Sequence, residues 1–188
     1  TLHWIVSDTN GKSIVIEKTK EGFKTYDNPI GVLTNSPTFG WHLTNLNEYM
    51  KTTPVQPENV KWGNKELRPL GVGMGTKGLP GGFSGVDRFV RIAYLKSKFP
   101  VSEDLLSGIS QFFHMLNNVA MPRGAVISEG SDDITLYSSC MCQQKGIYYY
   151  STYNNNGVSA VDMNKEDLDG KEIKRFEYLD KLNILYQN

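Results

Sequence analysis

Apolar runs separated by turn residues open the chain, a pattern typical of antiparallel strands. Two such runs in "LHWIVSDTNGKSIVIEK" flank Asn10-Gly11, a pair favoured in two-residue turns because both central residues take positive φ. This stretch therefore predicts a β-hairpin. The segments "FKTYDN" and "GVLTN" predict two further strands, separated by Asn28-Pro29.

Helical spacing replaces this pattern in the middle of the chain. Apolar residues in "FGWHLTNLNEYM" recur three or four positions apart, which predicts a short amphipathic helix. Ser84 and Asp87 have the form of a capping box, so a second helix is expected through "VDRFVRIAYL". On a wheel of this helix, Asp87 and Arg91 fall on the polar side, whereas Arg88 points towards the buried flank.

A third helix is expected after Glu103 and Asp104, whose charges suit the positive end of a helix, with Pro122 closing it. Its apolar face would consist of Leu105, Leu106, Ile109, Phe112, Phe113 and Leu116. Four strand candidates follow, namely "ITLYSSCMC", "GIYYYSTY", "VSAVDM" and "IKRFEYL". Strands, then helices, then strands predict an α+β fold with mainly antiparallel sheet.

Length and composition are those of an ordinary globular protein. The chain has 188 residues, of which 39% are hydrophobic and 21% charged, enough for a single domain over residues 1–188. We interpret the polar, proline-containing segment 52–70 as an excursion from that domain.

Twenty basic residues balance twenty acidic ones, so charge favours neither nucleic acid nor a membrane as a partner. Without an apolar run of about 18 residues or a signal-peptide pattern, we expect a soluble, cytoplasmic protein.

The cysteines and histidines do not form an obvious metal site. Cys140 and Cys142 are two residues apart in an expected strand, on one face and roughly 7 Å apart, too far for a disulfide. They lack matching zinc ligands, and His3, His42 and His114 show no ligand spacing. We therefore expect packed thiols, structural histidines, and neither metal nor cofactor.

Gly73, Gly75 and Gly78 spell G-x-G-x-x-G, the letters of a phosphate-binding loop. A dinucleotide site requires a strand immediately before these glycines and a helix that opens at them. Here "NKELRPL" precedes them and Pro80 follows. We interpret the stretch as a tightly turning loop in which glycine lets the backbone approach a neighbour closely.

Three residues have both a structural and a functional interpretation. Arg88 can pair with a core carboxylate, or it can be a fixed cation that lowers a thiol pKa or holds an anion. Asn35, before Ser36-Pro37, can bond its own backbone, or its amide can point into a cleft. Thr1 can be a nucleophile whose own amine is the base, although it opens directly onto an expected interior strand.

Five blocks of the sequence resemble the choloylglycine hydrolase family, the bile salt hydrolases of gut bacteria. They are "TLHWIVSD", "NPIGVLTNSPTF", "GLPGGFSGVDRFVRIAYL", "FFHMLNNVAMPRG" and "MCQQKGIYYYSTYNNNGVSAVDMN". The likeness extends over essentially the whole chain, which is similar to the C-terminal portion of those enzymes. It implies the fold of N-terminal-nucleophile hydrolases, a four-layer αββα sandwich with mainly antiparallel sheets.

The resemblance also implies an activity and a set of site residues. In that family an N-terminal cysteine attacks the amide that joins a bile acid to glycine or taurine, and its α-amine acts as the base. Asn35 matches an asparagine that stabilises the tetrahedral oxyanion, and Arg88 matches the arginine beside the nucleophile. Leu2 matches an apolar wall of the steroid pocket. Segment 52–70 matches a subunit-packing segment, which implies a homotetramer.

The nucleophile of that family has no counterpart among these residues. Cys140 and Cys142 do not match it, and Thr1 matches an interior position. We therefore expect this chain to hydrolyse no amide by itself, the cysteine being supplied by an N-terminal portion. Three other functions stay open: a penicillin V acylase, which shares fold and nucleophile; a non-catalytic bile acid or sterol-binding module; and a self-contained threonine hydrolase.

Overall fold

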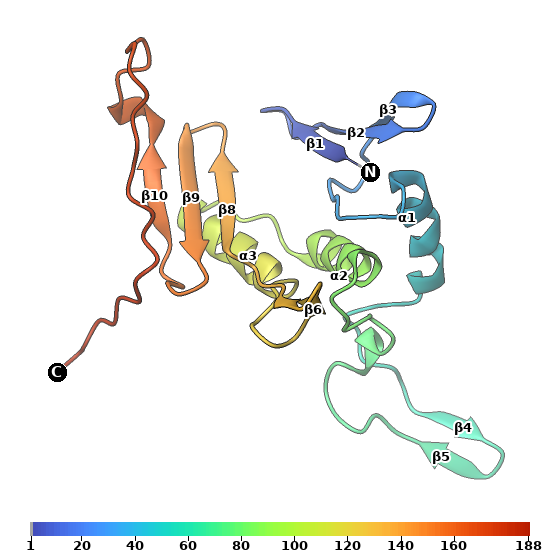
Figure 1. Cartoon of the computed structure of the whole chain (residues 1–188). Helices are drawn as coiled ribbons and strands as arrows, with labels where there is room; N and C mark the ends of the chain where they lie inside the picture. Colours follow the sequence, from blue (N-terminus) through green and yellow to red (C-terminus); the bar gives the residue numbers. More distant parts are fainter. Residues whose placement is uncertain (1) are drawn as a thin grey trace. The chain divides into compact units, whose positions relative to one another are not determined.

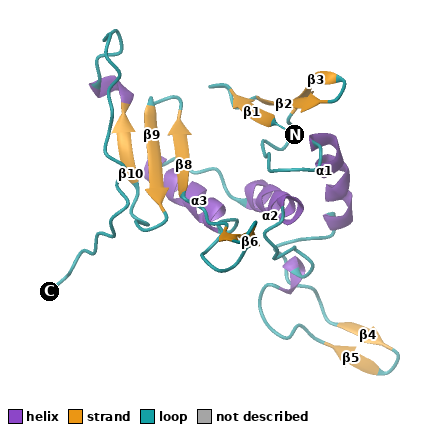
Figure 2. Ribbon diagram, in the orientation of Figure 1, coloured by secondary structure: helices purple, strands orange, loops and turns teal. Residues whose placement is uncertain are grey.

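The computed structural model describes residues 2–188 and groups the chain into two units (Figures 1 and 2). The first unit comprises the residues up to Ser7 together with Lys12–Pro100, and the second comprises Asp8–Gly11 and Val101–Asn188. Every strand pair in the described chain is antiparallel. The prediction of an α+β fold with antiparallel sheets is therefore confirmed.

The first unit begins with a three-stranded sheet in the order β1-β2-β3. Its strands are β1 (His3–Ser7), β2 (Ser13–Thr19) and β3 (Gly22–Asp27). Ser7 pairs with Ser13, so residues 8–12 form the connecting loop, which is longer than the two-residue turn predicted at Asn10-Gly11. Gly11 takes a φ of 80° there, whereas Asn10 does not take a positive φ. Both the predicted hairpin and the predicted strand "FKTYDN" are confirmed.

The predicted strand over residues 31–35 is wrong, because these residues form no ladder. The buried side chain of Asn28 takes up their backbone groups instead: its Oδ1 accepts from Gly31 N–H at 2.8 Å, and its Nδ2 donates to the Val32 carbonyl at 3.2 Å. Gly31 has a φ of 60°, which an extended strand does not allow. Asn35 therefore lies in a bend and not at the end of a strand.

Two predicted helices of the first unit are confirmed. They are α1 (Phe39–Asn45), continued by the 3₁₀ turn η1 (Leu46–Tyr49), and α2 (Gly85–Lys98). Ser84 caps α2 as expected, since its Oγ accepts from Asp87 N–H at 3.1 Å and donates to the Asp87 carboxylate at 2.9 Å. The helices and the sheet share a core of Val15, Val32, Phe39, Phe89 and Ala93.

The prediction that Arg91 lies on the polar side of α2 is wrong. Its side chain is 7% exposed, and its Nη1 donates to the carbonyls of Pro80 and Gly82 at 2.8 and 2.7 Å. These carbonyls belong to the loop before α2 and need donors, because the loop has no strand neighbour. A helical wheel considers only the residues of the helix, so it does not predict hydrogen bonds to the preceding loop.

Segment 52–70 contains a small hairpin, β4 (Val60–Trp62) and β5 (Lys65–Leu67), which lies apart from α1 and α2 within the first unit (Figure 1). Its strands are largely exposed. The role of this segment in subunit packing stays a prediction.

The glycine stretch that follows is a tight turn. Gly73, with φ 84°, starts the 3₁₀ turn η2 (Met74–Thr76). A Cβ on Gly75 would lie 2.1 Å from the Val55 carbonyl oxygen, so only glycine allows this approach of two backbone segments. The helix α2 begins at Gly85 and not at the motif. The interpretation as a close backbone approach is confirmed.

The second unit packs α3 (Leu105–Asn117) against a sheet in the order β10-β9-β8. The strands are β8 (Tyr137–Cys142), β9 (Ile147–Thr152) and β10 (Ser159–Asp162), and shorter elements are β6 (Ile127–Ser128), β7 (Ser131–Asp132) and the 3₁₀ turn η3 (Met163–Lys165). Ile109 and Phe113 are the buried residues of the α3 face, whereas Leu106 is 71% exposed. The helix ends five residues before Pro122, and Asn118 Nδ2 donates to the His114 carbonyl there.

Cys140 and Cys142 pack against this core as half-buried free thiols, which confirms their structural interpretation. Burial raises the pKa of the Cys140 thiol and so disfavours its thiolate. The Cys140 sulfur therefore has the environment of a packing residue and not of a nucleophile.

The predicted strand "IKRFEYL" (173–179) is wrong. Side chains of β9 occupy its carbonyls: Tyr150 OH donates to Glu177 O at 3.4 Å, and Thr152 Oγ1 donates to Leu179 O at 3.1 Å. The segment thus contacts β9 through side chains rather than a backbone ladder.

None of the helices in the described chain has the length and apolar character that crossing a membrane requires.

Candidate functional site

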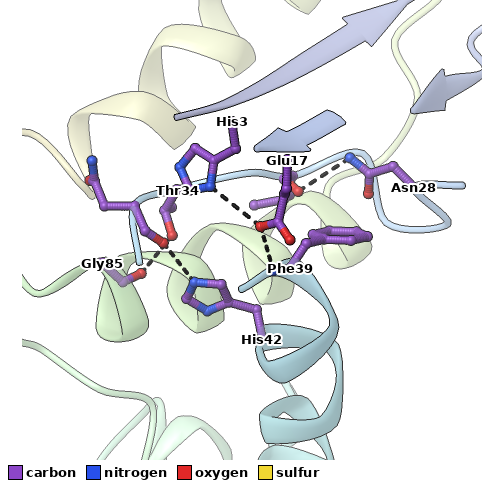
Figure 3. A network of polar contacts seen from close by, with 9 residues as sticks. His3, Glu17, Asn28, Thr34, Phe39, His42 and Gly85 are labelled. Carbon is purple, nitrogen blue, oxygen red and sulfur yellow. Dashed lines mark hydrogen bonds and ion pairs between the residues drawn. The ribbon is translucent and has the colours of Figure 1, made fainter. Parts of the chain in front are cut away.

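The loop that carries Asn35 packs closely on the first turn of α2. Thr34 Oγ1 donates to the Gly85 carbonyl at 2.7 Å (Figure 3). A Cβ on Gly85 would lie 2.9 Å from the Ser36 carbonyl oxygen and 3.2 Å from Asn35 Cβ. Glycine at the first residue of α2 therefore lets the loop approach the helix.

Arg88 binds the side chain of Asn35 directly. Its Nη2 donates to Asn35 Oδ1, and its Nε donates to the Phe83 carbonyl at 2.9 Å. No carboxylate within residues 2–188 forms an ion pair with it, so the alternative of a core salt bridge is not observed. Burial, and secondarily the charge of Arg91, lowers the pKa of Arg88, but a guanidinium stays protonated in proteins. The site thus holds a half-buried fixed cation.

This contact decides how the Asn35 amide is oriented. Because Oδ1 accepts from Arg88, the Nδ2 amino group points the other way. Asn35 is exposed, and its Nδ2 has no hydrogen-bond partner among the described residues. A turn asparagine that bonds its own backbone is not observed. The arrangement presents two N–H donors outwards, which is what a developing oxyanion requires.

Behind the loop, His42 holds the backbone of the same residue. His42 lies on α1, is fully buried, and places Nε2 2.8 Å from the Asn35 carbonyl oxygen. Its ring stacks on Phe89 of α2, with centroids 4.3 Å apart and an interplanar angle of 17°. Burial lowers the pKa of His42, which favours the neutral ring. This histidine was expected to be structural, and its contact with Asn35 was not anticipated from the sequence.

A buried carboxylate completes the polar network of the first unit. Glu17, on β2, is fully buried, and its Oε1 accepts from Phe39 N–H at the start of α1 at 2.7 Å. His3 Nδ1 lies 3.5 Å from the same oxygen, and both groups approach the carboxylate in Figure 3. Thr38, the N-cap of α1, makes no side-chain cap, so Glu17 satisfies a helix N–H from a neighbouring strand. The signal in the sequence for this contact is a glutamate inside the otherwise apolar run of "SIVIEK".

The other predicted site residues lie outside this network. Leu2 is 64% exposed, and its carbonyl accepts from Lys18 N–H at 2.9 Å. His114 is in the last turn of α3, in the second unit. Thr1 is outside the described residues, so its role as a nucleophile is untested. Within residues 2–188, no group of three or more His, Cys, Asp and Glu side chains is arranged to hold a metal ion.

The family model for linear amide C–N hydrolases of the choloylglycine hydrolase family matches residues 1–176. The protein is thus a member of the linear amide C–N hydrolase class. Within that class, the chain belongs to the choloylglycine hydrolase family.

Three similar proteins from bacteria illustrate the likeness. Bile salt hydrolase/transferase of Clostridium perfringens is 51% identical over 189 residues, which cover 100% of this chain and 57% of the relative. The crystal structure of a mutant conjugated bile acid hydrolase from Clostridium perfringens matches with a TM-score of 0.92, 51% identity, and coverage of 100% of this chain and 57% of that chain. Penicillin V acylase from Agrobacterium tumefaciens matches with a TM-score of 0.66 and 26% identity, over 88% of this chain and 46% of that chain. The chain thus spans about half the length of these relatives, from 46% of the acylase to 57% of the bile salt hydrolase.

Proposed function

We propose that this chain forms the C-terminal part of a cysteine amidase that hydrolyses glycine- or taurine-conjugated bile salts. The nucleophilic cysteine would come from an N-terminal part that these residues do not include. The observation that carries the proposal is the Asn35 amide, held by Arg88 through its oxygen and free to donate through its nitrogen. The 51% identity to a bile salt hydrolase supports the substrate class.

The chemistry follows from the two side chains. The charge of Arg88 favours the thiolate of a nearby cysteine, and the α-amine of that cysteine, with a pKa of about 8, accepts the thiol proton. The sulfur attacks the amide carbon, and Asn35 Nδ2 donates to the oxygen that becomes negative. As the C–N bond breaks, the protonated amine gives its proton to the leaving glycine or taurine nitrogen. Water then attacks the resulting thioester and gives a proton to the amine; the C–S bond breaks, which releases the bile acid and regenerates the cysteine.

The remaining residues extend this proposal. Both units would belong to one N-terminal-nucleophile hydrolase domain with four αββα layers. Leu2, exposed at the start of the chain, would form part of the apolar wall for the steroid, which binds mainly by apolar burial. Val60 and Trp62 in the β4–β5 hairpin are 51% and 74% exposed, which supports a role of segment 52–70 in packing the subunits of a homotetramer.

The test uses residues 1–188 joined behind the N-terminal part of the Clostridium perfringens relative, referred to below as the completed chain. We expect it to release glycine from glycocholate, and we expect no release from residues 1–188 alone or from a completed chain whose N-terminal cysteine is replaced by alanine. Cleavage of penicillin V without release of glycine would favour the acylase. Binding of bile acid without turnover, in a folded completed chain, would favour a non-catalytic module.

The Gly85→Ala substitution should lower kcat of the completed chain by about 10-fold, because small misplacements of a positioned group are costly. The added methyl group would press on the Ser36 carbonyl oxygen, a backbone atom, and so shift the loop that carries Asn35. The KM for glycocholate should change little. Gly40→Ala in α1 is the matched control, since a Cβ there meets nothing within 4 Å. Equal kcat values for the two variants would contradict the prediction.

A further inference from the structure

His42 contacts Asn35, the residue whose amide is proposed to donate to the oxyanion. Its Nε2 lies 2.8 Å from the carbonyl oxygen of Asn35, seven residues earlier in the chain. The ring has little freedom to move, because it is fully buried and stacks on Phe89. The Trp41 ring meets it edge-on from the same helix, with centroids 5.8 Å apart. The His42 ring is therefore a rigid support for the Asn35 backbone.

The hydrogen bond also determines which nitrogen of the ring carries the proton. A carbonyl oxygen only accepts, so Nε2 must be the donor. His42 Nδ1 is buried and has no partner among the described residues, which fits a bare nitrogen better than a second N–H. The charged or titratable groups near the His42 ring are His3 on β1 and Glu17 on β2. Arg88 of α2 lies on the other side of Asn35, whose side chain it binds. The neutral ring with its proton on Nε2 is thus the form that the site holds.

Asn35 is consequently held at two points by two helices. His42 of α1 holds the main-chain carbonyl, and Arg88 of α2 holds the side-chain oxygen. Thr34, the preceding residue, is bound to the Gly85 carbonyl of α2. Rotation about the Asn35 backbone would move the amide nitrogen, and the His42 contact opposes that rotation.

We propose that His42 is a positioning residue of the amide hydrolysis, which acts by holding the Asn35 carbonyl so that Nδ2 meets the oxyanion. This inference rests on the proposed function. The oxyanion contact forms only in the transition state, so loss of His42 should lower kcat and leave KM for glycocholate nearly unchanged. A purely structural histidine would have no reason to act through Asn35.

Two substitutions in the completed chain separate the hydrogen bond from the packing of the ring. His42→Phe keeps an aromatic ring on Phe89 but lacks the donor, and we expect about a 10-fold loss of kcat, in line with the loss of one buried hydrogen bond. His42→Gln supplies an amide N–H at a similar distance along the side chain and should restore most of that loss. A His42→Phe variant with unchanged kcat would overturn the proposal.

The decisive comparison repeats His42→Phe in the Asn35→Ala background. If His42 acts through Asn35, the second substitution should lower kcat almost no further there, whereas an undiminished 10-fold loss of kcat would overturn the proposal.

The ¹⁵N spectrum of the histidine-labelled completed chain gives a reading that requires no substituted protein to be active. Its His42 signals, assigned by their absence in His42→Gln, should be those of the neutral ring protonated on Nε2, and any other form would overturn the proposal. Failure of the unsubstituted completed chain to release glycine would instead refute the proposed function.

Discussion

Asn35→Ala is expected to lower kcat of the completed chain for glycocholate by about 10²- to 10³-fold, the usual effect of removing one oxyanion donor. The Asn35 amide is oriented by Arg88 so that its N–H groups have no other partner among the described residues. Because the contact strengthens only as the tetrahedral intermediate forms, KM should change little. Steady-state release of glycine measures both constants.

Two further variants make this result specific. Asn35→Asp keeps an oxygen for Arg88 but replaces the donor by a second acceptor, so it should be at least as inactive as the alanine variant. Asn47→Ala removes an exposed asparagine that bonds the Thr44 carbonyl, and it should leave kcat unchanged. Wild-type kcat in Asn35→Ala would show that the oxyanion is stabilised elsewhere.

Arg88→Met should cause a loss of about 10³-fold or more in kcat/KM, because one substitution removes two effects. It releases the Asn35 side chain, and it removes the positive charge that favours the thiolate. Without that charge the thiol pKa rises, so the acidic limb of the kcat/KM profile should move to higher pH. The measurement is kcat/KM for glycocholate across the acidic and neutral range.

Arg88→Lys separates these two contributions. Lysine keeps the charge, so the acidic limb should stay near its wild-type position. A single ammonium does not reproduce the fixed fork that binds Phe83 O and Asn35 Oδ1 together, so kcat should still fall. If the limb of Arg88→Met stays where it is in the unsubstituted protein, Arg88 does not lie beside the sulfur and the proposed role is wrong.

The predicted hairpin and the cap formed by Ser84 and Asp87 were confirmed. The cap involves groups a few bonds apart, which is why residue type and spacing suffice to predict it. The failures depend on distant partners. Residues 31–35 and 173–179 have strand-like composition, but in both segments side chains bond backbone groups that a strand would pair with a neighbouring strand.

The sequence by itself determined the antiparallel α+β character, the helix starts, and the resemblance that singled out Asn35 and Arg88. Only the tertiary structure decided how these two residues meet. They are 53 positions apart, and their contact depends on Gly85 letting the loop approach α2 and on His42 holding the same loop from α1. Hydrogen-bond geometry at such separations is set by how the elements pack, because no local pattern encodes the direction in which an amide points.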